Sequence, residues 1–213
     1  MTADTNNYLT HHLSVGIGSI AVAVLLWVAG YEDQQVVAAV PWLLLVLVMI
    51  IGPMVRLWPA INERSSKNFP VSWRSELGIW FAIWGVVHLL YVFQAREWDV
   101  IGYLSTMSPW AFGSLVAVII AIVLAVTSNN RTYAYLGAKA WKWLQTVGAY
   151  VIFWLLAVHI YDRAYLRPGF PSDDPMHWVY LITLILVVVL HIAAFFNVVA
   201  QYRRTGEHPP GLG

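Results

Sequence analysis

Six long apolar segments divide the chain, and they constrain its fold more than any other feature. They cover about residues 13–30, 38–58, 75–94, 109–128, 141–161 and 178–200. Each comes close to the ~20 mostly apolar residues that an α-helix needs to cross the hydrocarbon core of a membrane. Backbone polar groups must be satisfied internally in lipid, which favours helices. The sequence therefore predicts an all-α, polytopic membrane protein with a six-helix transmembrane bundle.

The composition is typical of the same class. Hydrophobic residues make up 60% of the 213 residues and charged residues only 11%, whereas soluble domains carry about 25% charged residues. The formal net charge of +1 does not suggest nucleic acid as a partner. The chain has no cysteine, which excludes disulfides, iron–sulfur clusters and thiol catalysis.

The links between the apolar segments are short, so we expect one transmembrane domain over residues 1–213. The N-terminus lacks a basic region and a small-residue cleavage site, which favours a retained first helix over a signal peptide. Residues 201–213 are expected to form a tail whose last stretch, HPPGLG, is disordered or bound to a partner.

Basic residues predict the orientation in the membrane, because cytoplasmic loops retain lysine and arginine. Nine of the twelve fall on one side of the predicted bundle. These are Arg56, Arg64, Lys67, Arg74, Arg131, Lys139, Lys142, Arg203 and Arg204. Both termini are therefore predicted to be cytoplasmic, and we expect the bacterial inner (cytoplasmic) membrane.

Tryptophans lie near the ends of the predicted helices, as an interfacial aromatic belt requires. They are Trp42, Trp58, Trp98, Trp110, Trp141, Trp143 and Trp178. We expect them to anchor the bundle in contact with membrane lipids.

Three of the seven histidines, His88, His159 and His191, lie inside apolar segments. Ionisable residues at such positions are rare and usually functional. The other four are expected to be solvated or interfacial: His11, His12, His177 and His208.

His88 and His159 are predicted to lie at nearly the same depth. His88 is fourteen residues beyond Arg74, or about 21 Å along a helix. His159 is seventeen residues beyond Lys142, or about 25 Å. Both then occupy the outer half of the membrane, where two neutral imidazoles could be the axial ligands of a b-type haem. Without cysteine, covalent attachment of a c-type haem is excluded.

Small residues lead to both histidines at helical spacing. Before His88 they are Gly78, Ala82 and Gly85. Before His159 the small residue is Gly148, in a series with Gln145, Ile152 and Leu155. They could leave room for a flat macrocycle. The alternative is that they let helices approach closely, with each histidine hydrogen-bonded to a neighbour.

His191 is expected about 20 Å from the outer end of its helix, in the inner half of the membrane. It has no histidine at matching depth except, loosely, His11 and His12. Three roles stay open for it: a polar contact between helices, a hydrogen-bond donor to a quinone, or a ligand to a second haem.

Two runs resemble a known family. The first ends a helix with GPMVRL and continues through a basic loop to WRSELGIWFAIWGVVHLLYV; the second is VLAVTSNNRTYAYLGAKAWKWLQTVGAYVIFWLLAVHIY. In order and spacing they resemble the ferric reductase-like transmembrane domain over about residues 42–162. The resemblance is greatest to its bacterial haem-b branch, typified by the membrane subunit of the periplasmic methionine sulfoxide reductase system.

The resemblance implies which histidines bind haem. In that family the third and fifth helices carry the ligands, often an outer and an inner histidine on each. His88 and His159 match the outer pair. The inner positions depart from the pattern, with Gln145 on the fifth helix and Arg74 and Ser75 on the third. One outer haem b is therefore expected, and a second haem only through His191.

The resulting expectation is an electron-transfer subunit. Electrons would come from a quinol or a separate reductase, because no glycine-rich dinucleotide fingerprint is present, and would leave to an acceptor at the outer face. Gln145, with Trp141 and Arg74, marks an inner site that could hold a quinone headgroup.

Three arginines are expected on the outer side: Arg96, Arg163 and Arg167. They could pair with haem propionates or an acidic protein partner, or serve as ordinary interface anchors.

Two other classes of function compete with electron transfer. The chain could be an accessory or structural subunit of a larger membrane complex on the same fold, with little or no redox role. A small transporter is less favoured, because no carboxylate lies in the middle of an apolar segment.

Overall fold

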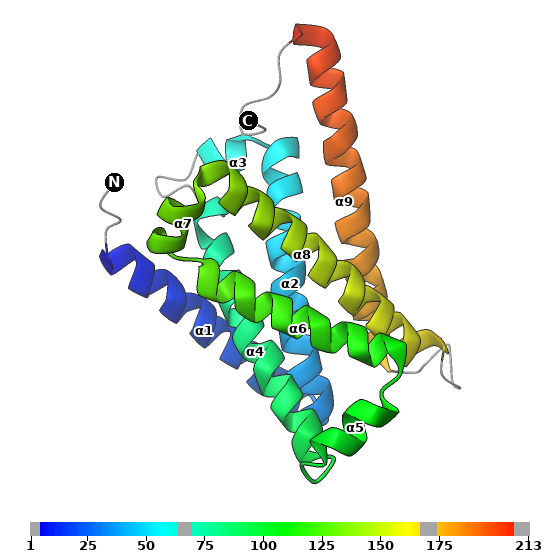
Figure 1. Ribbon diagram of the computed structural model, residues 1–213. Coiled ribbons are helices and arrows are strands. Elements are labelled where there is room, and N and C mark those ends of the chain that lie inside the picture. Colours follow the sequence, from blue (N-terminus) through cyan, green and yellow to red (C-terminus); the bar gives the residue numbers. More distant parts are fainter. Residues whose placement is uncertain (1–4, 64–69, 167–173, 207–213) are drawn as a thin grey trace.

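The computed structural model describes residues 5–63, 70–166 and 174–206. Within these ranges the chain is helical and has no strand (Figure 1). Six helices are long and apolar enough to cross a membrane. They are α1 (Thr5–Val28), α2 (Asp33–Leu57), α4 (Arg74–Gln94), α6 (Pro109–Thr127), α8 (Ala138–Tyr161) and α9 (Pro175–Thr205). The predicted all-α, six-helix fold is confirmed.

Short helical turns fill the links, which the sequence patterns did not predict. They are α3 (Ala60–Glu63), a 3₁₀ turn η1 (Val71–Trp73), α5 (Val100–Thr106), α7 (Asn130–Leu136) and a π-helical turn η2 (Asp162–Leu166). Local capping explains where two of them begin. Asp99 accepts from the backbone N of Gly102 at the start of α5, and Asn129 accepts from Thr132 at the start of α7.

The last helix is longer than predicted. Asp174 caps its start and Pro175 occupies its first turn, while Gly206, with φ of +70°, ends it. Residues 201–205, expected to be part of a tail, are therefore helical. The rest of the predicted tail, including His208, lies outside the described residues, as do Arg64, Lys67 and Arg167.

The two ends of the bundle differ in charge. The basic end, near α3 and α7 in Figure 1, carries Arg56, Arg74, Arg131, Lys139, Lys142, Arg203 and Arg204. The acidic end, near α5, carries Glu32, Asp33, Glu97, Asp99, Asp162 and Asp174. Which end faces the cytoplasm remains a prediction from the charge asymmetry.

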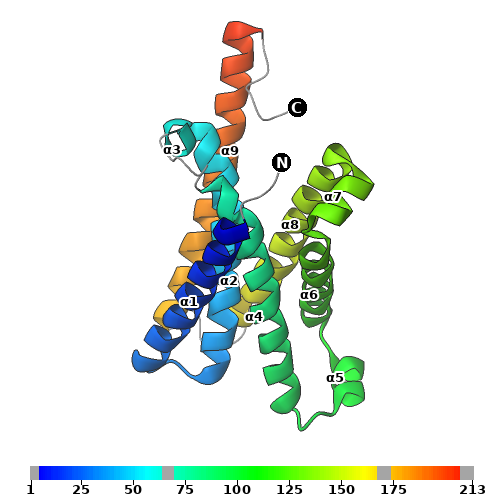
Figure 2. The same cartoon turned by 90° about the vertical axis from the view of Figure 1, so that its left-hand side faces the viewer.

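The central helix of the bundle is α2. It packs against α4, α9 and α1, while α6 packs against both α4 and α8. In its most apolar window 67% of the residues of α2 are buried, against 11% for α9, whose other faces are left for lipid. Figure 2 shows α6 and α7 on one side of α4, and α1, α2 and α9 on the other. The two helices that carry His88 and His159, α4 and α8, are not a closely packed pair.

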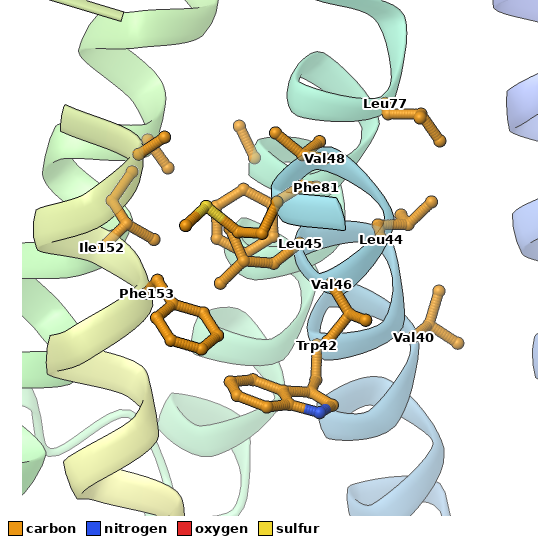
Figure 3. Packing of buried hydrophobic residues seen from close by; sticks show 14 of the residues in the cluster. Val40, Trp42, Leu44, Leu45, Val46, Val48, Leu77, Phe81, Ile152 and Phe153 are labelled. Atoms are coloured by element: carbon orange, nitrogen blue, oxygen red, sulfur yellow. The ribbon is translucent and has the colours of Figure 1, made fainter. Parts of the chain in front are cut away.

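Trp42 joins three helices in the core. Its indole stacks on Phe153 of α8 at 5.8 Å between ring centroids (Figure 3). It also meets Tyr180 of α9 edge-on at 6.2 Å. Its Nε1 donates to Oγ1 of Thr183 at 2.9 Å. Only 2% of Trp42 is exposed, so its assignment to the interfacial belt is wrong.

The other predicted belt tryptophans divide into two groups. Five are exposed, as an interfacial position requires: Trp58, Trp98, Trp110, Trp143 and Trp178. Trp141 is half-buried, and its Nε1 donates to the backbone O of Thr127 at the end of α6. It therefore ties α8 to α6.

Polar contacts attach α1 to α4. Nε1 of Trp80 donates to the backbone O of His12 at 3.0 Å, and Nε1 of Trp84 donates to Oγ of Ser19 at 2.9 Å. Gly16 lies directly against the Trp80 ring, and a Cβ at this position would come within 2.3 Å of it. The glycine therefore allows the close approach of the two helices.

Gly16→Ala is expected to reduce the free energy of unfolding by about 1–3 kcal/mol, because the added methyl group displaces the Trp80 ring from the groove it fills. The matched control is Gly18→Ala on the same helix, where a Cβ meets nothing within 4 Å. Unfolding by SDS in mixed micelles, followed by circular dichroism, measures both. Equal effects of the two substitutions would contradict close packing at Gly16.

Candidate cofactor site

Two cavities of about 310 Å³ each lie between α4 and α8, one toward each end of the bundle. Ligand pockets in proteins typically measure roughly 300–1,000 Å³. Phe81 lines both cavities, and it is 4% exposed. We call the two spaces the acidic-end cavity and the basic-end cavity; an apolar layer that includes Phe81 separates them.

The acidic-end cavity brings together the two histidines that the sequence paired. His88 from α4 and His159 from α8 both line it. Because α6 packs against both helices while they do not pack closely on each other, the space between the histidines is left open. Gly85, one turn before His88, also lines the cavity, and a Cβ there would meet only Val118 at 3.7 Å.

The His88 ring is poorly satisfied in this setting. Its Nδ1 is buried and has no hydrogen-bond partner among the described residues. A buried polar atom without a partner costs about 1–3 kcal/mol. His159 and Arg163 are close enough to act on His88 electrostatically. The site thus holds an imidazole nitrogen that a metal or a hydrogen-bonding ligand would satisfy.

A third histidine, His177, lines the same cavity. Its Nδ1 is buried without a hydrogen-bond partner in the described part of the chain, and its Nε2 lies 4.0 Å from Oδ2 of Asp174. Asp174 also accepts from Nε2 of Gln35 at 2.9 Å. The sequence predicted a solvated or interfacial His177 and did not indicate that this residue lines a cavity. The signal was the spacing of Asp174 and His177, one turn apart at a helix start.

The arginines predicted on the outer side differ in position and contacts. Arg163 lines the acidic-end cavity and is exposed. The guanidinium of Arg96 lies over the ring of Tyr103, 5.2 Å from its centroid. Arg167 is outside the described residues. Of the two that the structure describes, Arg163 is the cation placed to meet an anionic group in the cavity.

The basic-end cavity contains the predicted inner polar site. Arg74, Trp141 and Gln145 all line it. Gln145, however, already donates from Nε2 to the backbone O of Leu124 at 3.1 Å and to Oγ of Ser128 at 3.2 Å. Its amide therefore fastens α8 to the end of α6, and its contact with a quinone stays a prediction.

The described lining of this second cavity contains no aspartate, glutamate or histidine.

His191 lies outside the linings of both cavities. Its Nδ1 is 2.8 Å from the backbone O of Val187, one turn earlier on α9, and its ring meets Tyr150 of α8 edge-on at 5.4 Å. His11 lies elsewhere, with its ring 5.2 Å from that of Trp73 beside the start of α4. The ring is therefore held by its own helix and by an aromatic contact with α8, and the three roles stay predictions.

Gly148 of α8 serves packing rather than a cavity. A Cβ at Gly148 would lie 2.8 Å from Leu124 of α6, and Leu155 contacts α6 at Gly113. The expectation that Gly148 leaves room for a macrocycle is therefore wrong. On α4 the expectation fits better, because Gly78 and Gly85 line the two cavities.

Glu76 is a buried carboxylate that the sequence analysis did not single out. It is 3% exposed, accepts from Oγ of Ser75 at 2.7 Å, and lies 3.9 Å from Nδ1 of His11. Its place at the start of the third apolar segment was the available signal. The pair ties α1 to α4 at the basic end.

Comparisons with known proteins do not assign the chain to a family. No protein-family model matches the chain, and no curated protein matches it. Within the described residues there is also no group of three or more histidine, aspartate or glutamate side chains that could hold a metal ion. Two axial histidines are fewer than the three side chains that define such a group, so this finding does not bear on them.

Gln145→Leu is expected to lower the free energy of unfolding by about 1 kcal/mol, because the amide that joins α8 to α6 is lost. Thr146→Val is the matched control. It removes a hydroxyl from the wall of the same cavity, next to Gln145. SDS unfolding monitored by circular dichroism compares the two; a neutral Gln145→Leu would show that the amide does not stabilise the helix pair.

Proposed function

We propose that the chain is a haem-b-binding electron-transfer subunit of the bacterial cytoplasmic membrane, related to the ferric reductase-like transmembrane domains. His88 and His159 are the proposed axial ligands, and the acidic end faces outward. The observation that carries the proposal is the convergence of these two histidines, from two helices that do not pack closely, on one cavity.

The residues around the two histidines fit such a group. His88 offers a buried ring nitrogen without a hydrogen-bond partner in the described structure, and either nitrogen of a neutral imidazole can bind a metal. The wall between them is largely apolar, with Leu89, Leu115 and Leu156 among its members. Arg163 supplies a positive charge at the same cavity, which suits an anionic substituent such as a propionate.

When bound, a bis-histidine haem b would supply reversible one-electron transfer without an open coordination site for oxygen. The protein residues determine access to it. Phe81 and the apolar layer around it separate the site from the basic end. On its other side the cavity is lined by His177, whose Nε2 lies 4.0 Å from Oδ2 of Asp174. We infer one haem per chain, because Gln145 is engaged with α6 and His191 with its own helix and Tyr150.

The electron donor is proposed to be a quinol or a separate reductase, and the acceptor a partner at the outer face. Two observations bear on the donor. The basic-end cavity lacks a described base, whereas the acidic-end cavity is lined by histidines and Glu32. If the donor is a quinol, its protons are better accepted at the acidic end.

Haem binding is tested by the dithionite-reduced minus oxidised spectrum of the protein, purified from cells that make haem. The expected result is a b-type spectrum with one haem per chain. His88→Ala and His159→Ala should each lose at least about nine-tenths of the haem, because a single axial imidazole holds it weakly.

His177→Ala and His191→Ala are the matched controls and should keep full haem content. Loss of haem in His177→Ala, with retention in His88→Ala, would assign a different ligand pair. A wild-type protein without a Soret band would instead favour the accessory or structural subunit of a larger membrane complex.

A further inference from the structure

The basic-end cavity combines an apolar wall with two cationic side chains, Arg74 and Lys142. We propose that it binds an anionic phospholipid of the surrounding membrane, whose phosphate is held by Arg74 and Lys142 and whose acyl chain enters along the apolar wall. The proposal does not depend on haem binding in the other cavity.

Arg74 is the first of the two cations at the cavity. It begins α4, lines the cavity and is only partly exposed. Within the described residues its guanidinium has no ion pair and no hydrogen bond. A charged group inside the membrane boundary is costly unless it is paired. An anion in the cavity would supply the missing partner.

The neighbours of Arg74 increase this requirement. Arg56 of α2 is close enough to repel its charge, and Lys142 of α8 lines the same cavity. The buried carboxylate at this end, Glu76, is directed to Ser75 and His11 instead. In the part of the chain that the structure describes, the guanidinium of Arg74 therefore has no carboxylate beside it.

The rest of the wall fits an acyl chain. It is formed by Leu45, Val48, Phe81, Leu124, Ala149 and Ile152, from α2, α4, α6 and α8. Helix α9 contributes no lining residue, because α8 and α9 approach each other at the acidic end and diverge toward the basic end (Figure 1). A ligand with an anionic head and an apolar tail thus matches both parts of the cavity.

The same lining argues against two other occupants. No described lining residue is a histidine, so a second bis-histidine haem has no ligands there. No described lining residue can act as a carboxylate or imidazole base, which disfavours a reacting quinol. Basic pockets between transmembrane helices on the cytoplasmic side are a known type of site for anionic lipid headgroups.

The test compares lipids of different charge on the purified protein in detergent. Dioleoyl phosphatidylglycerol is expected to raise the thermal unfolding midpoint by about 5 °C at saturation, and dioleoyl phosphatidylcholine by much less. Native mass spectrometry should show one phosphatidylglycerol retained per chain.

Arg74→Gln should abolish both the difference between the lipids and the retained adduct, and Lys142→Gln should weaken both. Arg74→Lys, which keeps the charge, should retain most of the preference. The matched control is Arg131→Gln, which removes an exposed basic residue at the same end but outside the cavity lining; it should behave as wild type. If Arg74→Gln does not fold, the test uses Lys142→Gln and Arg74→Lys, each compared with the control Arg131→Gln.

Three results would overturn the proposal. Equal stabilisation by the two lipids would remove the role of headgroup charge. An unchanged preference in Arg74→Gln and Lys142→Gln would place the lipid elsewhere on the protein. An equal shift with inorganic phosphate alone would indicate a site for a small anion, without a role for the acyl chain.

Discussion

The stacking of Trp42 on Phe153 determines how far α8 lies from the rest of the bundle. On one side α8 packs extensively on α6. On the other side this aromatic pair, 5.8 Å between ring centroids, joins α8 to the central helix, and the same indole meets the edge of Tyr180 on α9. Two large rings thus fill the space between α2 and α8, while α4 and α8 do not pack closely on each other.

That separation leaves two cavities with opposite chemistry in one interhelical gap. One is lined by three histidines and Arg163, the other by Arg74 and Lys142. Between them the side chain of Phe81, supported by the core around Leu45 and Phe153, forms an apolar layer (Figure 3). The fold therefore places a candidate metal-binding site and a cationic site in series along the helices, without direct contact between them.

The sequence predicted the features that depend on long apolar runs. It did not predict those that depend on the direction in which a side chain points. The six spanning helices follow from hydrophobic length alone, which leaves few alternatives in lipid. The joint position of His88 and His159 could be expected from helical rise, since both helices start from the basic end. Trp42 was misassigned because its position near a helix end does not reveal that its ring points inward against Phe153. Gly148 was misassigned because spacing along α8 does not show that this face meets Leu124 of α6. His177 and Glu76 were missed because each acquires its partners from tertiary packing at the edge of an apolar segment.

The apolar layer at Phe81 also has an electrical consequence. A membrane voltage falls mainly across the low-dielectric part of a protein, and moving one elementary charge through the full field is worth about 2.3 kcal/mol per 100 mV. Under the proposed function, an electron that enters from the basic end would cross this layer to reach His88, and its transfer would work with or against the voltage. An electron delivered at the acidic end would avoid the layer and be nearly insensitive to the voltage. The position of Phe81 would then make the side of electron entry matter for the energetics of the transfer.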